Sequence, residues 1–179
     1  MGKIWRLLSL TTLILLLTSC SIGDSNMRKM FFARNDKQIA NERFEALIDA
    51  VQTHNSDAVK ALFSNNVLRE VENIDDSVQE LLDYFQGNLL SYKAWAGPDV
   101  SAKKDNGNYW KSYDCTYDFE TTQDKYRLAM EIITVDTTDA DNIGIRSLYI
   151  IRFEDDTDPN CAYRGDGAYT TGINIGKTQ

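Results

Sequence analysis

The sequence predicts an α+β fold in which three N-terminal helices pack on an antiparallel sheet. Apolar residues recur at helical spacing in the first half of the chain, and in the second half they alternate with polar residues at a two-residue period. Helices that precede strands favour an arrangement in which the helices cover one sheet face. Short connections between the strands favour a meander, and the roughly 140 residues of the domain region are enough for one domain.

Three helices are expected before residue 90. The first starts at residue 37 and has an apolar stripe at helical spacing, formed by Ala40, Phe44, Leu47, Ile48 and Val51. Residues 55–57 offer a stop and a new N-cap, after which Val59, Leu62 and Phe63 predict a second helix. The third helix is expected from about residue 75 to Gly87.

The strands are predicted from alternation. Residues 112–120 alternate strictly, and residues 126–133 and 145–153 repeat the pattern. An earlier strand is expected over residues 90–96, ended by Pro98, and Asn106-Gly107-Asn108 is a strong turn signal.

The N-terminus has the pattern of an export signal. Lys3 and Arg6 precede an apolar run from Leu7 to Leu17, and residues 1–19 contain no acidic residue. A membrane-spanning helix needs roughly 20 apolar residues, which is more than this run provides. We therefore expect a signal peptide at residues 1–19, a flexible tether at 20–35 and a single domain at 36–179.

Cys20 is the expected attachment point for lipid. Leu17-Thr18-Ser19-Cys20 resembles the lipobox of bacterial lipoproteins. The resemblance implies cleavage before Cys20 and diacylglycerol on its sulfur, with fatty acids such as palmitate holding the protein at the extracytoplasmic face of the bacterial cell membrane. Two acyl chains suffice for stable anchoring.

The charge balance restricts the partners. The chain has a net charge of −8, and loss of Lys3 and Arg6 with the signal leaves 17 basic residues against 27 acidic ones. An acidic surface repels phosphate backbones, so no nucleic-acid partner is expected. For the same reason the sequence predicts membrane attachment through the lipid on Cys20 rather than through a basic patch.

The domain also resembles a known family. The lipobox, "DAVKALFS" (Asp57 to Ser64), "SVQELLDYFQGNL" (Ser77 to Leu89) and "DKYRLAMEIITVDTTDADNIGIRSLYI" (Asp124 to Ile150) are similar to a family of uncharacterised bacterial lipoproteins assigned the nuclear transport factor 2-like, or ketosteroid-isomerase-like, cone fold. The resemblance implies a strongly curved sheet around a cavity that the helices close. It implies no reaction, so no catalytic residue is carried over.

Thiol and metal chemistry are weakly supported. Once Cys20 is acylated, Cys115 and Cys161 remain, and in an exported domain they can form a disulfide. Cys115 also shares the apolar face of its strand and can equally be a packed free thiol. With one histidine, His54, and no C-x-x-C pair, no metal site or cofactor is predicted.

An aromatic set offers a candidate pocket. Tyrosines on the predicted strands and a tryptophan beside them can line a cavity with apolar walls and a few polar points, or they can simply pack in the core. The candidate lining residues are Trp95, Tyr113, Tyr117, Tyr126, Ser147 and Tyr149.

The favoured hypothesis is a lipid-anchored, non-enzymatic module that binds a small molecule or a protein. A first alternative is an enzyme of ketosteroid-isomerase type, in which a buried carboxylate transfers protons beside tyrosine donors. Glu131 or Asp118 would be the proton-transferring carboxylate. Strand alternation puts both on the face opposite the strand tyrosines, so the enzyme is less favoured. A second alternative is a scaffold with a filled core that binds a protein on its outer sheet face.

Overall fold

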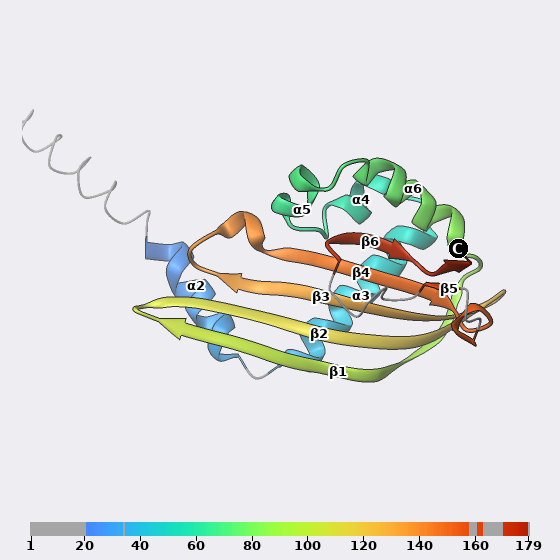
Figure 1. Cartoon of the computed structure of the whole chain (residues 1–179). Helices are drawn as coiled ribbons and strands as arrows, with labels where there is room; N and C mark the ends of the chain where they lie inside the picture. Colours follow the sequence, from blue (N-terminus) through green and yellow to red (C-terminus); the bar gives the residue numbers. More distant parts are fainter. Residues whose placement is uncertain (1–20, 34, 158–160, 163–169, 179) are drawn as a thin grey trace, which may run out of the picture.

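The computed structural model describes residues 21–33, 35–157, 161–162 and 170–178, and it confirms the α+β class (Figure 1). The helices are α2 (Ser21–Phe32), α3 (Asp36–Gln52), α4 (Ser56–Lys60), α5 (Asn65–Glu70) and α6 (Ile74–Tyr84). The strands are β1 (Leu89–Asp105), β2 (Asn108–Thr121), β3 (Lys125–Asp136), β4 (Gly144–Arg152), β5 (Cys161–Ala162), β6 (Gly172–Ile175) and β7 (Lys177–Thr178). Two 3-10 turns, η1 (Ala140–Asn142) and η2 (Asp155–Thr157), flank β4.

The main sheet is curved, open and mixed. Its strand order is β1-β2-β3-β4-β6, and β1 to β4 form the predicted antiparallel meander. The fifth strand, β6, instead runs parallel to β4, so the prediction of a purely antiparallel sheet is wrong at this edge. Strands β5 and β7 pair separately in a two-stranded sheet.

Strand β1 is much longer than predicted. It continues through Pro98 to Asp105 with register shifts on either side of Ala96. Because β1 is an edge strand, it has one side without a neighbour, and a proline there removes no ladder hydrogen bond. The expectation that Pro98 ends the strand is therefore wrong.

The three predicted helices are found near their predicted positions, but their lengths differ from the prediction. Helix α3 matches the first predicted helix, and Asn55 caps α4 by accepting a hydrogen bond from the backbone N–H of Ala58. Helix α4 ends at Lys60, and a helix that was not predicted, α5, follows it. Ser21–Phe32, expected within a flexible tether, forms α2.

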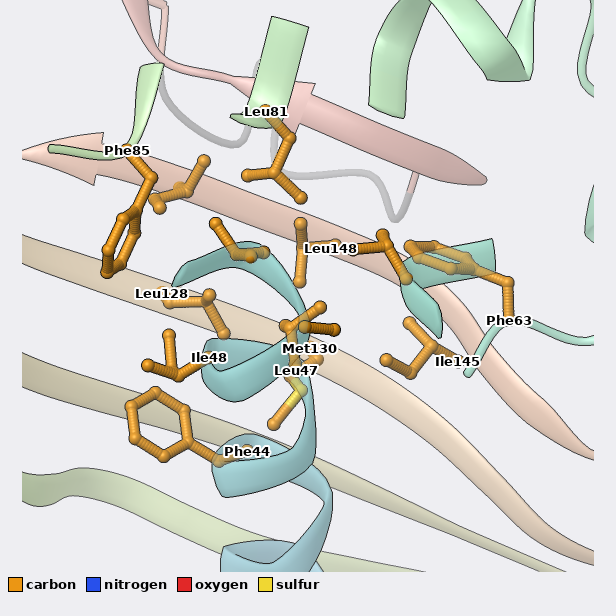
Figure 2. Close-up of a cluster of buried hydrophobic side chains, with 14 of the residues drawn as sticks. Phe44, Leu47, Ile48, Phe63, Leu81, Phe85, Leu128, Met130, Ile145 and Leu148 are labelled. Carbon is orange, nitrogen blue, oxygen red and sulfur yellow. The ribbon is translucent and has the colours of Figure 1, made fainter. Parts of the chain in front are cut away.

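The core lies between α3 and the sheet (Figure 2). Phe44, Leu47 and Ile48 of α3 meet Leu128, Met130 and Leu148 of β3 and β4, and each of the six is at most 2% exposed. The cone fold implied a cavity at this position. The structure instead fills the space with close-packed apolar side chains, the ordinary way in which a helix and a sheet stabilise each other.

A buried polar cluster fixes the start of α3. The ammonium of Lys111, 3% exposed, lies 2.5 Å from the carboxylate of Asp36, which also accepts a 2.7 Å hydrogen bond from the hydroxyl of Tyr113. Burial alone would raise the pKa of Asp36, but the hydrogen bonds from Lys111 and Tyr113 and the lysine charge lower it below 3.8.

Candidate functional site

The six candidate pocket residues do not lie together, because they divide between the two faces of the sheet. Tyr113, Tyr117 and Tyr126 face the helices, where each hydroxyl has a partner and the rings belong to the packed interior. The ring of Tyr117, for example, stacks on Phe44 at 4.3 Å between centroids. These three tyrosines therefore serve as core residues.

A β-bulge in β4 accounts for the placement of Ser147 and Tyr149. Ile132 pairs with Ile145, but the preceding residue, Glu131, pairs with Ser147, so Arg146 is an extra residue in β4. The extra residue resets the alternation, and Ser147 and Tyr149 point to the face opposite the helices. Simple alternation along the sequence placed Tyr149 on the same face as the other tyrosines.

On that opposite face lies a small pocket, which we call the acidic pocket. A row of direct cross-strand partners forms its floor, namely Asp99 on β1, Asp114 on β2, Glu131 on β3 and Ser147 on β4. The pocket has a volume of about 100 Å³, and its remaining lining residues include Trp95, Thr116, Ala129 and Tyr149. Three of the six predicted residues, Trp95, Ser147 and Tyr149, therefore do share a site.

Gly97 allows β1 to close one side of this pocket. Its φ is +82°, and a Cβ built there would lie 2.3 Å from the carbonyl oxygen of Asp114. Only glycine fits so close to the neighbouring backbone. The bulges next to Gly97 bring both Trp95 and Asp99 to the pocket.

Glu131 is a buried carboxyl group in the lining of the pocket. It is 8% exposed, and its carboxylate oxygens lie 3.2 and 3.3 Å from a guanidinium nitrogen of Arg146. Burial raises the pKa of Glu131 above 4.5, the Arg146 charge partly opposes this, and the charge of Asp114 raises the pKa further. The net result is a carboxyl group that takes up a proton more readily than an exposed glutamate does.

Ser147 supplies the clearest unsatisfied group. Its side chain is 1% exposed, and its Oγ has no hydrogen-bond partner among the residues that the structure describes. A hydroxyl offers one donor and two acceptor sites, and leaving it unpaired in a protein interior costs about 1–3 kcal/mol. A bound polar ligand would remove that cost.

Aromatic groups border the pocket. Tyr149 is 3% exposed, and its hydroxyl accepts a hydrogen bond from the backbone N–H of Thr170. Trp95 is 58% exposed, and the guanidinium of Arg127 lies 4.4 Å from its ring centroid. The site thus combines carboxylates and hydroxyls with an aromatic rim.

Asp118, the second carboxylate considered for proton transfer, lies further along the same face and does not line the pocket. It is 7% exposed and pairs with Arg127 at 2.8 Å. Its charge is therefore balanced within the sheet. Asp114 and Arg146, by contrast, were not singled out from the sequence, although an aspartate in the middle of a long strand is unusual enough to have marked Asp114.

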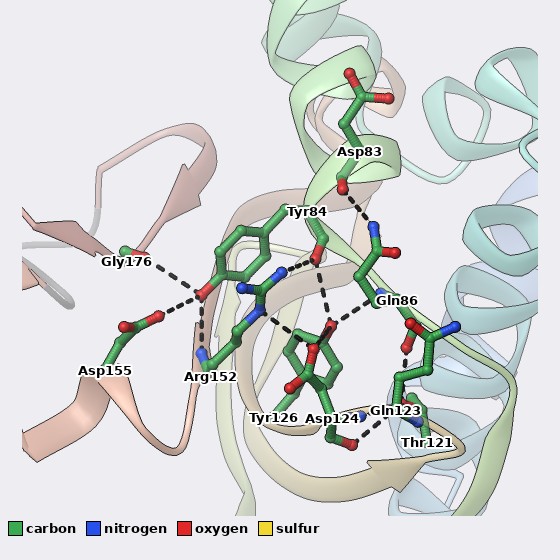
Figure 3. A network of polar contacts seen from close by, with 10 residues as sticks. All are labelled: Asp83, Tyr84, Gln86, Thr121, Gln123, Asp124, Tyr126, Arg152, Asp155 and Gly176. Atoms are coloured by element: carbon green, nitrogen blue, oxygen red, sulfur yellow. Dashed lines mark hydrogen bonds and ion pairs between the residues drawn. The ribbon is translucent and has the colours of Figure 1, made fainter.

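A second polar cluster joins the end of α6 to the sheet (Figure 3). The hydroxyl of Tyr84 accepts a 2.9 Å hydrogen bond from the backbone N–H of Arg152, whose guanidinium donates to the Tyr84 carbonyl at 3.1 Å. Tyr126 donates to the same carbonyl and accepts from the backbone N–H of Gln86. Burial raises the pKa of Tyr84 to about 12. Such extensively bonded groups indicate a structural role.

Two wider hollows, of about 370 and 360 Å³, lie near the start of β3 and share Glu120, Lys125 and Phe153. Their charged residues are largely paired, as Lys93 is with Asp118 and Lys125 with Glu120. Neither hollow contains a buried hydroxyl without a partner among the described residues. The acidic pocket is the stronger candidate despite its smaller volume.

Cys115 is a free, buried thiol in this structure, with its Sγ 3.7 Å from the carbonyl oxygen of Met130. The side chain of Cys161 lies outside the described residues, so its disulfide with Cys115 stays a prediction. Cys115 is in the middle of the main sheet, whereas the backbone of Cys161 pairs with β7. Burial raises the pKa of Cys115 to about 12.

Across the described ranges, no group of three or more His, Cys, Asp or Glu side chains is arranged to hold a metal ion. No helix within the same ranges is both long and apolar enough to cross a membrane. Residues 1–20, with the predicted signal and Cys20, lie outside the described part of the chain.

Comparison with known proteins places the chain in a family. Residues 46–153 match the model of a domain of unknown function, DUF5104, and the chain belongs to that family. The match begins within α3 and ends just after β4, so it includes Asp99, Asp114, Glu131 and Ser147. No curated protein matches the chain.

Proposed function

We propose that this member of the DUF5104 family is a lipid-anchored binding module at the extracytoplasmic face of a bacterial membrane, and that the acidic pocket holds its ligand. The observation that carries the binding proposal is the buried Oγ of Ser147, which has no partner among the described residues and lies beside the partly desolvated carboxyl of Glu131. A ligand group placed between them would satisfy both.

The chemistry of the pocket favours a ligand that donates hydrogen bonds. Asp114 and Glu131 provide carboxylate oxygens, and Arg146 is the cation paired with Glu131. A primary ammonium can donate to a carboxylate and to Ser147 Oγ at once, and its charge is attracted by the acids. A volume of about 100 Å³ suits such a head group or a ligand of a few heavy atoms.

The ligand proposal is tested with matched pairs of small molecules that differ in one ammonium group, such as ethanolamine against ethylene glycol and glucosamine against glucose. We expect the amines to shift the backbone NMR signals of Asp114, Glu131 and Ser147 more strongly than the neutral partners do. Ser147→Ala and Glu131→Gln should each weaken amine binding about tenfold, the usual worth of one hydrogen bond to a charged group.

Glu120→Gln is the matched control, because Glu120 lies on β2 outside the acidic pocket and pairs with Lys125. It removes one carboxylate charge without touching the pocket lining. The binding proposal is wrong if the amines and neutral compounds give equal shifts, or if Glu120→Gln weakens binding as much as Glu131→Gln.

The membrane location rests on the lipobox-like Leu17-Thr18-Ser19-Cys20. Mass spectrometry of the protein from the membrane fraction should find Cys20 at the amino terminus with diacylglycerol attached. Cys20→Ser should leave the protein uncleaved and without the lipid. An unmodified amino terminus at any other residue would refute the lipid anchor.

A second function, proton transfer by Glu131, is favoured by one observation. Burial raises the pKa of Glu131 above 4.5, which favours a role in accepting and returning a proton. Tyr149 lines the same pocket and could hold a substrate oxygen. Turnover of a ligand found in the binding screen, lost in Glu131→Gln while binding persists, would establish the enzyme and replace the binding module.

A further inference from the structure

The end of the molecule that includes α2 carries a surface that the acidic pocket does not explain. Helix α2 starts at Ser21 and packs beside the tip of the β1–β2 hairpin (Figure 1). Phe31 and Phe32 of α2 contact the ring of Tyr109 at centroid distances of 4.9 and 6.0 Å. The helix and the hairpin tip therefore form one continuous surface.

This surface exposes large apolar side chains. Phe32 is 57% exposed and Met30 is 41% exposed, although Phe32 already contacts Tyr109. They are two of only five large apolar side chains exposed to this degree in the described part of the chain. Met30 and Phe32 are two residues apart and therefore project from different sides of α2, so they do not form one patch. Both nevertheless lie in the last turn of the helix, where each exposed side chain can enter a nonpolar phase at this end of the molecule.

The charge of the surface is opposite to that of the whole protein. Helix α2 and residues 103–110 together contain four basic residues and two acids, Asp24 and Asp105, whereas the whole chain has 19 basic and 27 acidic residues. The basic residues are Arg28, Lys29, Lys103 and Lys104. Basic residues therefore outnumber acidic ones in this region, although the molecule as a whole is acidic.

The lysines of the hairpin tip lie over aromatic rings. The ammonium of Lys103 is 5.3 Å from the centroid of Trp110, and that of Lys104 is 5.7 Å from the centroid of Tyr109. Tryptophan and tyrosine favour the head-group level of a bilayer, where lysine stems lie along apolar surface and their charges meet lipid phosphates. The hairpin tip therefore has the composition of a membrane interface.

We propose that Arg28, Lys29, Met30, Phe32, Lys103 and Lys104, named the tether-end surface, rest on the anionic lipid surface of the membrane. The proposal extends the lipid anchor proposed above, since Cys20 directly precedes α2 and would hold this surface at the bilayer. The basic residues bind lipid phosphates, and Phe32 and Met30 enter the acyl boundary. The lipid supplies attachment, and the tether-end surface supplies orientation.

The charge contribution is tested without the lipid, using the chain from residue 20 with Cys20→Ser, which contains every described residue. We expect it to sediment with vesicles containing phosphatidylglycerol and not with pure phosphatidylcholine, and to be released by salt. Lys103→Ala with Lys104→Ala should lower the partition coefficient about 10- to 30-fold, as expected for two lysines at an anionic surface. Phe32→Ala should lower it as well.

Lys93→Ala with Lys125→Ala is the matched control. It removes the same charge from the opposite end of the sheet, where Lys93 pairs with Asp118 and Lys125 pairs with Glu120. Equal loss in both double variants, or equal binding to both kinds of vesicle, would contradict the proposal. Because this assay contains no lipidated cysteine, its result does not depend on whether Cys20 is modified.

Orientation is tested in the lipidated protein on vesicles of brominated phosphatidylglycerol. After the signal is removed, Trp95 and Trp110 are the only tryptophans. In Trp95→Phe, the remaining Trp110 fluorescence should be quenched by the bromine, whereas in Trp110→Phe the remaining Trp95 should not be. No quenching of Trp110 would overturn the proposal, and equal quenching of both would show attachment without the proposed orientation.

Discussion

Asp114 on β2 and Glu131 on β3 are direct cross-strand partners, so two carboxylates lie side by side on one face of the sheet. Directly opposite side chains in an antiparallel ladder have Cβ atoms about 5 Å apart, and like charges at that separation repel. Arg146, the extra residue of the β4 bulge, lies next to Glu131 and partly offsets the repulsion. The bulge thus brings Ser147 and Tyr149 to the pocket. It also places Arg146 where its charge reduces the repulsion between Asp114 and Glu131.

Glu131→Gln should change the pH dependence of stability. Because the folded-state pKa of Glu131 is raised above 4.5, the folded protein binds its proton more tightly than the unfolded chain does. Stability is therefore lost as pH rises from 4.5 through the folded pKa. Urea unfolding should show Glu131→Gln matching the wild type at pH 4 and exceeding it at pH 7.

Asp114→Asn provides the control for this assignment. It removes the neighbouring charge that helps to raise the Glu131 pKa, so the loss of stability between pH 4 and pH 7 should be smaller in Asp114→Asn than in the wild type. An unchanged profile in both variants would show that Glu131 is not responsible.

Lys111→Met should destabilise the start of α3. The change leaves Asp36 without its 2.5 Å charged partner, and loss of a charged hydrogen bond costs about 1.5–3 kcal/mol. Since the pKa of Asp36 is lowered, its contribution is present above pH 3.8 and is lost as pH falls through its folded value. Denaturant unfolding should show a large difference in the free energy of unfolding between the wild type and Lys111→Met at pH 7. At pH 3 the difference should be smaller.

The double variant Asp36→Asn with Lys111→Met isolates the pair. We expect it to be more stable than the sum of the two single changes predicts, because the second change removes a group that the first left unpaired. Strict additivity would show that the two side chains act independently.

Gly144→Ala should be more disruptive than Gly107→Ala. Both glycines have positive φ, +139° and +89°, and an added Cβ is strained in either conformation. At Gly144 the Cβ would also lie 2.5 Å from the backbone nitrogen of Ser64, whereas at Gly107 nothing lies within 4 Å. Thermal unfolding should show a loss of several degrees for Gly144→Ala beyond that for Gly107→Ala, and equal losses would contradict the close approach.

Cys115 should be unreactive until the protein unfolds. Its pKa of about 12 leaves little thiolate at pH 8, and its side chain is 4% exposed. In the Cys20→Ser, Cys161→Ser variant, iodoacetamide should label Cys115 only in denaturant. Rapid labelling of the folded variant would show that the thiol is accessible. Non-reducing mass spectrometry of the wild type tests the disulfide directly.

The sequence by itself determined the elements whose pattern is local. The apolar stripe of α3, the Asn55 cap and the alternation of β2 each depend on residues only a few positions apart, and each is found where predicted. The turn at Asn106 and Gly107 is equally local, because both residues have the positive φ that this turn requires.

Only the tertiary structure decided which side chains form the site. The row from Asp99 to Ser147 joins four strands, and it exists because the Arg146 bulge shifts β4 by one residue and Gly97 lets β1 approach β2. A one-residue shift moves side chains to the other face, and this register is set by pairing between segments far apart in the chain. Pairing between distant segments also placed β6 parallel to β4. Packing of α3 against the sheet filled the space where a cavity was expected. Helical spacing and alternation are properties of the sequence, but the facing of Tyr149, Glu131 and Ser147 is a property of the assembled sheet.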